Sequence, residues 1–158
     1  MIEWMKAIVL LPVNVTVILP VLILWITKFK YNPPHFLQTV LGVFLLLVGL
    51  FLAIWTMVLF HKIGKGTLAP WAMPKHLVTQ GPFKIIRNPM IAGILLILSA
   101  QALILNTIYI FYWAVLFFII NCIYFKLFEE KQLERNFGQA YLEYKKNVPM
   151  FFPKFSRK

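Results

Sequence analysis

The chain has 158 residues, of which 61% are hydrophobic and only 13% are charged, and its mean hydropathy is +0.78. Soluble domains average about 45–50% apolar and about 25% charged residues, so this composition argues against a soluble domain. It predicts an integral membrane protein with a single domain, residues 1–158. The formal charge is +11, and the cations flank apolar runs, which suits anionic lipid headgroups better than nucleic acid. The single cysteine, Cys122, excludes an internal disulfide and a cysteine-only metal site.

The first apolar run covers residues 8–27. At 1.5 Å per residue its 20 residues reach about 30 Å, enough to cross a bilayer. Pro12 and Pro20 are expected to kink this helix, which membrane helices tolerate. A cleaved signal peptide is the alternative, but no small-x-small cleavage pattern follows the run, so an anchor is preferred.

Three further spans are predicted at residues 36–60, 90–105 and 108–125. Helices over the last two would be about 24 and 27 Å long, slightly short of a hydrocarbon core of about 30 Å. They are interpreted as a tight helical hairpin around Asn106 and Thr107, with a partly re-entrant arrangement as the alternative. The fold class is therefore all-α: a polytopic membrane protein with about four transmembrane helices and a short cytosolic C-terminal helix, since residues from 126 to about 144 are polar and helix-prone.

The distribution of positive charge predicts the topology. All of the 16 Lys and Arg residues except Lys28 and Lys30 lie at the N-terminus, in residues 61–89 or in residues 126–158. Cytosolic loops are enriched in Lys and Arg, and four crossings place all three regions on one side. The two polar segments and both termini are therefore expected in the cytosol, where the segments can meet.

The first polar segment opens with GKGTLAPW, residues 64–71. Gly64 and Gly66 would allow a ligand to approach the backbone closely, and Thr67 adds a hydroxyl. The motif follows a membrane span rather than a strand, so the dinucleotide-binding fingerprint does not apply. On these residues alone, an ordinary loop is the better interpretation.

The motif KHLVTQGPFKIIRNPM, residues 75–90, ends at the start of a predicted helix. Pro89 suits the first helical turn, and Asn88 is a plausible N-cap whose side chain accepts from free backbone amides. Arg87 beside that helix N-terminus would form an anion site for a carboxylate or phosphate. A topology charge is the simpler role for Arg87, and a lone interfacial histidine such as His76 is more often neither ligand nor base.

Glu129 and Glu130 lie where the last apolar run ends. Ionisable groups near membrane depth tend to be functional. The alternative is a solvated helical turn, with Glu130 and Glu134 on one face at i and i+4. From the residues alone, these two interpretations are about equal.

Four blocks in this order resemble the integral-membrane methyltransferases that include isoprenylcysteine carboxyl methyltransferase and phosphatidylethanolamine N-methyltransferase. The blocks are GKGTLAPW, LVTQGPFKIIRNPMIAG, the glutamate pair and FGQAYLEYKKNVP, and they extend from about residue 60 to residue 153. The last block makes the isoprenylcysteine branch look closest. The resemblance implies a methyltransferase that uses S-adenosylmethionine at the cytosolic membrane face and a lipophilic acceptor from the bilayer, which could be a prenylcysteine-like carboxylate, a thiol or a lipid.

The resemblance also assigns site residues. It implies that Arg87, Asn88 and Glu130 are catalytic, and that Lys126 and Tyr141 contact the acceptor. Asn88 stands where the family has histidine, Phe83 where tyrosine is common, and Phe125 near an acceptor-binding arginine of the isoprenylcysteine enzymes. The cofactor-binding residues that it implies are Gly64, Gly66, Thr67, Lys75, His76, Leu77, Val78, Gly81, Phe83, Arg87, Asn88, Pro89, Met90, Ile91, Glu129 and Glu130.

Two other functions compete with methyl transfer. A sterol-type membrane reductase shares a related motif but is generally larger and uses NADPH, and the short chain with its glycine loop argues against it. A non-catalytic membrane protein of the same fold is the other alternative, and Asn88 is the residue that favours it.

Overall fold

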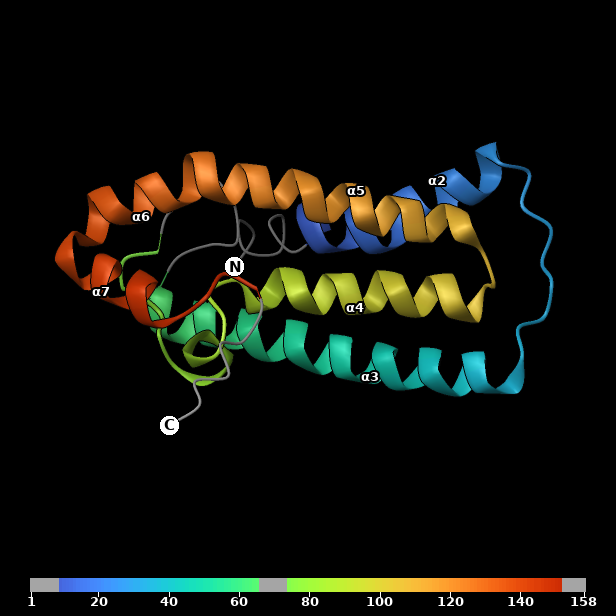
Figure 1. The fold of residues 1–158 in the computed structure, drawn as a ribbon, viewed down its shortest axis with the longest axis horizontal. Coiled ribbons are helices and arrows are strands. Elements are labelled where there is room, and N and C mark those ends of the chain that lie inside the picture. The colour runs from blue at the N-terminus through green and yellow to red at the C-terminus, as the bar shows by residue number, and fades with distance from the viewer. Residues whose placement is uncertain (1–8, 66–73, 152–158) are drawn as a thin grey trace.

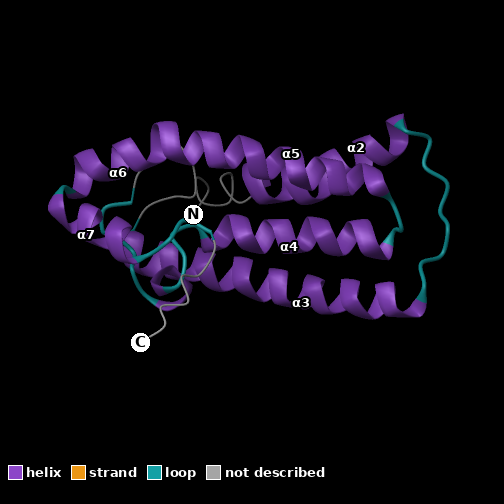
Figure 2. Cartoon of the chain, viewed as in Figure 1, coloured by secondary structure: helices purple, strands orange, loops and turns teal. Residues whose placement is uncertain are grey.

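The computed structural model describes residues 9–65 and 74–151. In this part of the chain every regular element is a helix and there is no strand, which confirms the all-α class (Figures 1 and 2). The elements in chain order are η1 (Val9–Ile18), α2 (Leu19–Ile26), α3 (Phe36–Leu59), η2 (Phe60–Gly64), η3 (Gly81–Lys84), α4 (Pro89–Ile104), α5 (Ile108–Tyr124), η4 (Phe125–Glu129), α6 (Glu130–Phe137) and α7 (Gln139–Asn147).

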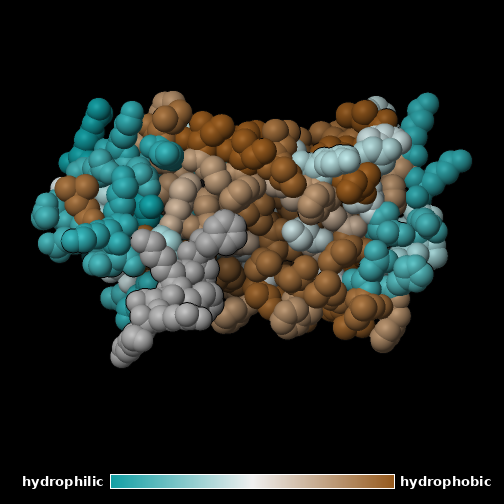
Figure 3. Space-filling view, in the orientation of Figure 1, coloured by the Kyte–Doolittle hydropathy of each residue, from teal (hydrophilic) through white to brown (hydrophobic). Residues whose placement is uncertain are grey.

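Hydrophobic side chains cover the middle of the elongated bundle, and hydrophilic side chains gather at its two ends (Figure 3). Two continuous helical segments, Phe36–Gly64 and Ile108–Phe137, are long and apolar enough to cross a bilayer. The apolar helices Pro12–Ile26 and Pro89–Ile104 are shorter. Large apolar side chains on the outer surface of α3 are exposed, including Phe36 at 85% and Leu37 at 75%. A helix surface of this kind is stable in lipid, and the chain is a membrane protein.

The N-terminal run is helical over most of its predicted length. Neither proline ends the helix, which is a π-helix around Pro12 and an α-helix from Leu19 onward. Residues of η1 form a π-helix that contains Pro12, and Pro20 lies in the first turn of α2. Because Pro20 has no N–H, carbonyls of the preceding turn need other donors. The Thr16 carbonyl accepts from Gln101 of α4 at 2.7 Å, and the Val15 carbonyl accepts from Trp113 of α5 at 3.1 Å. These bonds attach the first helix to the hairpin.

Helices α3 and α4 lie side by side along the bundle (Figure 1). Their backbones approach closely at Gly49 and Gly93, where a Cβ added to Gly49 would be 2.9 Å from the Gly93 carbonyl oxygen. Small residues permit such contacts between membrane helices, in which van der Waals packing replaces the hydrophobic effect. On the other side of α4, its apolar face packs against α5 in the main core cluster of Ile91, Ile94, Leu98, Ile110, Ala114 and Phe117.

The predicted hairpin is present. The turn is tight: Asn106 adopts a left-handed conformation with φ of 49°, and the Thr107 hydroxyl caps α5 by accepting from the Tyr109 amide at 3.4 Å. No break separates the predicted span of residues 108–125 from the helical region that follows it, because α5 continues through the π-helical turn η4 into α6 as far as Phe137. No glycine or proline interrupts residues 108–137, so nothing in the sequence stops the helix before Gly138.

Helices α6 and α7 form the polar end of the bundle, at the left of Figure 1. The chain reverses at Gly138, whose φ of 52° and ψ of −127° favour glycine. This turn folds α7 back toward η3 and the start of α4 (Figure 1). The C-terminal polar region is therefore helical, as predicted, but as two helices rather than one.

Candidate functional site

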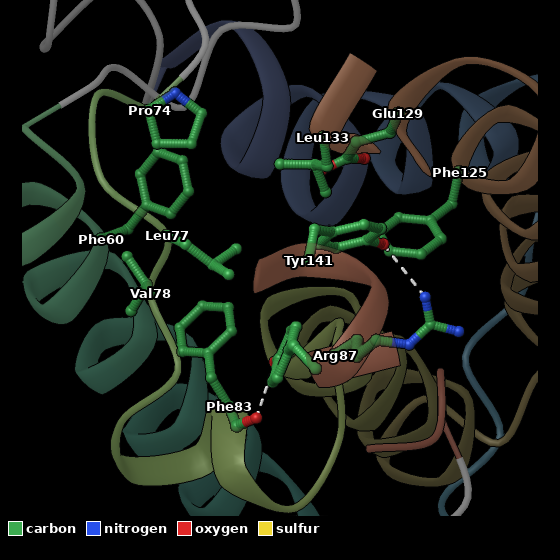
Figure 4. A pocket seen from close by; sticks show the side chains of 11 residues that line it. Phe60, Pro74, Leu77, Val78, Phe83, Arg87, Phe125, Glu129, Leu133 and Tyr141 are labelled. Atoms are coloured by element: carbon green, nitrogen blue, oxygen red, sulfur yellow. Dashed lines mark hydrogen bonds between the residues drawn. The ribbon is translucent and has the colours of Figure 1, made fainter. Parts of the chain in front are cut away.

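A pocket lies at the polar end, between the loop that precedes α4 and the helices that follow α5 (Figure 4). Its volume is about 450 Å³, counting the open space at its mouth. The walls are mostly apolar and aromatic, with one arginine and one glutamate. The lining residues are Phe60, Pro74, Leu77, Val78, Phe83, Arg87, Phe125, Glu129, Leu133, Tyr141 and Tyr144.

The first wall is the chain from Pro74 to Phe83. The amides of Lys75 and His76 donate to the Gly64 carbonyl oxygen at 2.7 and 3.3 Å, which holds this segment against the end of η2. A Cβ on Gly64 would lie 3.3 Å from Val78, so the absence of a side chain there lets the loop pack closely. The chain then presents Leu77 and Val78 to the pocket, and the short 3₁₀ helix η3 presents Phe83.

The second wall is one face of the long α5–α6 helix. Phe125, Glu129 and Leu133 are spaced by four residues and line the pocket together, as neighbours on a helix face do. The first two belong to the π-helical turn η4, a feature that is frequent at functional sites. Among the described residues, Glu129 makes neither a hydrogen bond nor an ion pair, so its carboxylate has no protein partner there.

Arg87 joins the two walls through a buried ion pair. Its Nη1 lies 2.5 Å from Glu130 Oε1 and donates to the Tyr141 hydroxyl at 3.0 Å. The guanidinium also lies over the Phe125 ring, 5.7 Å from its centroid. The side chains of Arg87 and Glu130 are only 9% and 8% exposed, and removing one partner of a buried pair typically costs about 3–5 kcal/mol. This pair therefore fixes the position of Arg87 on the pocket wall.

Lys145 of α7 extends the ion pair into a network. Its Nζ lies 2.8 Å from Glu130 Oε2 and 2.7 Å from Glu134 Oε1. Hydrogen bonds to these two carboxylates raise the pKa of Lys145, so it remains charged at neutral pH. The helical spacing of Glu130 and Glu134, noted from the sequence, thus places both carboxylates beside one cation.

Two tyrosines of α7 complete the pocket. Tyr141 is 1% exposed, and burial raises the pKa of its hydroxyl. The Tyr144 hydroxyl donates to the Phe83 carbonyl oxygen at 2.6 Å, and burial raises the pKa of Tyr144 as well (Figure 4). Both groups remain protonated at neutral pH; the Tyr144 hydroxyl donates, and the Tyr141 hydroxyl accepts from Arg87. The Tyr144 bond ties α7 directly to η3.

The segment after α7 binds the backbone beside Arg87. The amide of Arg87 donates to the carbonyl oxygen of Pro149 at 2.8 Å, and the amide of Asn88 donates to the carbonyl oxygen of Met150 at 3.2 Å. Pro89 begins α4, as predicted. The prediction that the Asn88 side chain caps this helix is wrong, because the side chain of Asn88 makes no capping hydrogen bond. The φ of −127° and ψ of 61° at Asn88 differ from the usual cap geometry, and the C-terminal segment pairs with this loop instead.

Six of the residues predicted for the site line the pocket: Leu77, Val78, Phe83, Arg87, Glu129 and Tyr141. Glu130 lies beside the pocket, held by Arg87 and Lys145. Several others are close in the chain but do not line it: Gly64, Lys75, His76, Gly81, Asn88, Pro89, Met90 and Ile91. Ile91 packs in the core, and Lys126 is exposed. Gly66 and Thr67 fall outside the described residues.

Five lining residues were not among the predicted ones: Phe60, Pro74, Phe125, Leu133 and Tyr144. A signal for three of them existed in the sequence. Phe125 and Leu133 lie four residues before and after Glu129, and Tyr144 lies three after Tyr141, so each shares a helix face with a predicted residue. Phe60 and Pro74 reach the site only through tertiary packing.

Comparisons with known proteins identify the family of this chain. Residues 37–140 match the family model described as phospholipid methyltransferase. A search of curated proteins found no match. The matched region is most of the chain and contains α3, the pocket loop and the glutamate pair. The chain therefore belongs to the phospholipid methyltransferase family, whose members are membrane methyltransferases.

The usual methyl donor of this family is S-adenosylmethionine, and the lining residues fit it. Phe60, Phe83 and Tyr141 offer aromatic surfaces to an adenine ring or a sulfonium cation. The unpaired carboxylate of Glu129 suits an amino group or ribose hydroxyls. Among the described side chains, the buried Nε of Arg87 has no hydrogen-bond partner.

Proposed function

We propose that the protein is an S-adenosylmethionine-dependent methyltransferase that transfers a methyl group to a lipophilic acceptor at the cytosolic face of the membrane. The observation that carries this proposal is the pocket, which brings Leu77, Phe83 and Arg87 together with Glu129 and Tyr141. These residues come from two segments about 40 residues apart, and both belong to the blocks of the sequence resemblance. The family match favours this activity over that of a reductase.

The bound cofactor would supply an electrophilic methyl group on a sulfonium, and the protein would supply binding and orientation. Arg87 would hold the carboxylate end of the cofactor, and Glu129 its amino group or ribose hydroxyls. Orientation of two reactants can provide about 7–11 kcal/mol of the rate advantage. The apolar lining, including Leu77, Phe125 and Leu133, would keep water away from the reacting atoms.

The proposed acceptor is a lipophilic molecule such as a prenylcysteine-like carboxylate, a thiol or a lipid. It would enter from the bilayer, because most of the residues that line the pocket are apolar. A carboxylate or thiolate needs no general base. An amine must lose a proton, and Glu129 is the lining carboxylate able to accept it. Asn88, in place of the family's histidine, does not line the pocket, so this departure leaves the lining unchanged.

The proposed topology has four crossings, with residues 61–89, residues 126–158 and both termini in the cytosol. The charge distribution supports it. At the polar end, exposed cations surround the pocket region; they are Lys62, Lys65, Lys75, Lys84, Lys126, Lys131, Arg135 and Lys146. At the opposite end lie Lys28 and Lys30, in the loop between α2 and α3. The hairpin α4–α5 would cross fully, helped by the continuation of α5 into α6.

One experiment tests both the activity and its face. Sealed vesicles carrying the protein are prepared inside-out and right-side-out, and methyl-labelled S-adenosylmethionine, which does not cross the bilayer, is added outside. We expect labelled product in the lipid phase of inside-out vesicles only. Vesicles with Arg87→Ala serve as the control for background labelling. Label in neither preparation would contradict the activity, and label only in right-side-out vesicles would contradict the topology.

A further inference from the structure

Glu129 brings a carboxylate into a mostly apolar part of the pocket. Its side chain points from the long α5–α6 helix toward the pocket interior, and Phe125 and Leu133 flank it on the same face (Figure 4). Arg87 also lines the pocket, but its Nη1 is already paired with Glu130 at 2.5 Å. In the part of the chain that the structure describes, no group donates to the Glu129 carboxylate. A ligand can therefore provide its partner.

The surroundings of Glu129 determine its charge in the ligand-free protein. Burial raises the pKa of Glu129 to about 7, and no facing group lowers it. From the loop before α4 the facing charge is Arg87, which Glu130 neutralises. From α7 the facing groups are the neutral hydroxyls of Tyr141 and Tyr144. The lining residues of η2 and of the segment after it carry no ionisable group. On its own helix the ionisable neighbours are Tyr124, Lys126, Glu130 and Lys131.

The two adjacent glutamates therefore differ in protonation. Burial alone would raise the pKa of Glu130, but hydrogen bonds from Lys145 and Arg87 lower it, so Glu130 is ionised at neutral pH. Glu129 exists there both as the carboxylic acid and as the carboxylate. A carboxylate in apolar surroundings ionises readily only when a cation compensates its charge. The methyl donor carries such a cation, because an α-amino group is protonated below about pH 8.

We propose that Glu129 couples binding of the methyl donor to the release of a proton: it holds a proton in the ligand-free pocket and loses it to water when the ammonium group of the donor binds. The carboxylic acid and the ammonium ion become an ion pair and one hydrated proton, so atoms and charge balance. The inference rests on the proposed function, and it selects the amino group rather than the ribose hydroxyls as the partner of Glu129. Because Glu129 is then occupied, acceptors that need no general base suit this site better than an amine does.

The first test is calorimetry of S-adenosylhomocysteine binding to the purified protein in detergent, in two buffers of different ionisation enthalpy. With half of Glu129 ionised near pH 7, binding at about pH 6 should release about 0.9 proton, and the affinity should be about five- to tenfold lower than at about pH 7.5. Equal affinity at both pH values with no proton release would overturn the inference and leave the proposed function in place. No binding at either pH would contradict the proposed function itself.

Two variants and one probe assign the proton. Glu129→Gln should bind with the same affinity across this pH range and release no proton, whereas Glu143→Gln, at an exposed position of α7, should behave as the wild type does. An analogue of S-adenosylhomocysteine that lacks only the α-amino group should bind the wild type and Glu129→Gln equally well, without proton release. A proton released in Glu129→Gln, or by the analogue in the wild type, would overturn the inference.

A further test observes the carboxylate directly. The chain has five acidic residues, all of them glutamates, so ¹³C labelling of the glutamate carboxyl carbon gives five side-chain NMR signals. The signal of Glu129 is identified by its loss in Glu129→Gln. We expect it to titrate near pH 7 in the ligand-free protein, and about one unit lower or more with saturating S-adenosylhomocysteine. A Glu129 signal that is fully ionised at about pH 6 in the ligand-free protein would overturn the inference, because no proton would remain to be released.

Discussion

At the scale of single residues, the site contrasts two neighbouring glutamates. Glu130 is 6% exposed and fully engaged by Arg87 and Lys145. Glu129 lines the pocket and has no hydrogen-bond or ion-pair partner in the described part of the chain. Adjacent residues of a helix point in different directions, so the two carboxylates have different surroundings. Their roles therefore differ: Glu130 stabilises the wall, and Glu129 is available to the ligand.

This contrast predicts the effect of Glu129→Gln. Burial raises the pKa of Glu129 to about 7, so its carboxylate is ionised mainly above that pH. The substitution keeps the size of the side chain, but glutamine cannot ionise, so binding of S-adenosylhomocysteine, measured by calorimetry above this pKa, should weaken about tenfold. The melting temperature should change little, because Glu129 makes no ion pair among the described residues. The control is Glu143→Gln, at an exposed position of α7. Unchanged affinity in Glu129→Gln would show that its carboxylate does not contact the ligand.

The sequence predicted part of this arrangement. Arg87, Glu129, Glu130 and Tyr141 were all identified from motif blocks, and all four meet at the polar end. The contact between Arg87 and Glu130 joins residues 43 positions apart, so local patterns cannot reveal it. The side-chain cap expected from Asn88 was mispredicted for a similar reason. The amide of Asn88 donates to the carbonyl oxygen of Met150, which is far away in the sequence.

At the scale of elements, the C-terminal part of the chain encloses the pocket. Helix α7 contributes two lining tyrosines, and the following segment accepts hydrogen bonds from the amides of Arg87 and Asn88. The extent of helix after Tyr124 follows from the sequence, since residues 108–137 contain no helix breaker. The folding of α7 back onto η3 does not, because it depends on the turn at Gly138 and on the distant bond from Tyr144 to Phe83.

These contacts predict the outcome of shortening the chain. A chain that ends at Asn147 lacks the carbonyls of Pro149 and Met150, which leaves the amides of Arg87 and Asn88 without their partners. Each lost bond typically contributes about 0.5–1.5 kcal/mol, so the melting temperature in detergent should fall. Hydrogen exchange at these two amides should accelerate.

A chain that ends at Phe151 is the matched control, because it keeps both carbonyls. It should exchange these two amides at the rate of the full-length chain. Equal exchange in the chain that ends at Asn147 would mean that the C-terminal segment does not hold the pocket loop.

At the scale of the whole molecule, an apolar belt lies between two polar ends, and the pocket lies at one of them (Figures 3 and 4). Composition and apolar runs predicted the membrane class and the helical fold. The distribution of Lys and Arg, with four crossings, also predicted that residues 61–89 and the C-terminal segment could meet. The extended loop that lines the pocket was not predictable in detail, because its path depends on packing against Gly64 and α7.

The central claim is that these two distant segments form one pocket that holds the methyl donor. The most direct measurement is cysteine protection, in a Cys122→Ala background that is otherwise free of cysteine. Leu133→Cys places a thiol on the pocket wall, and Lys131→Cys places one on the exposed surface of the same helix. We expect S-adenosylhomocysteine to slow the reaction of a maleimide with Leu133→Cys and not with Lys131→Cys. Equal reaction rates at residue 133 with and without S-adenosylhomocysteine would contradict the central claim.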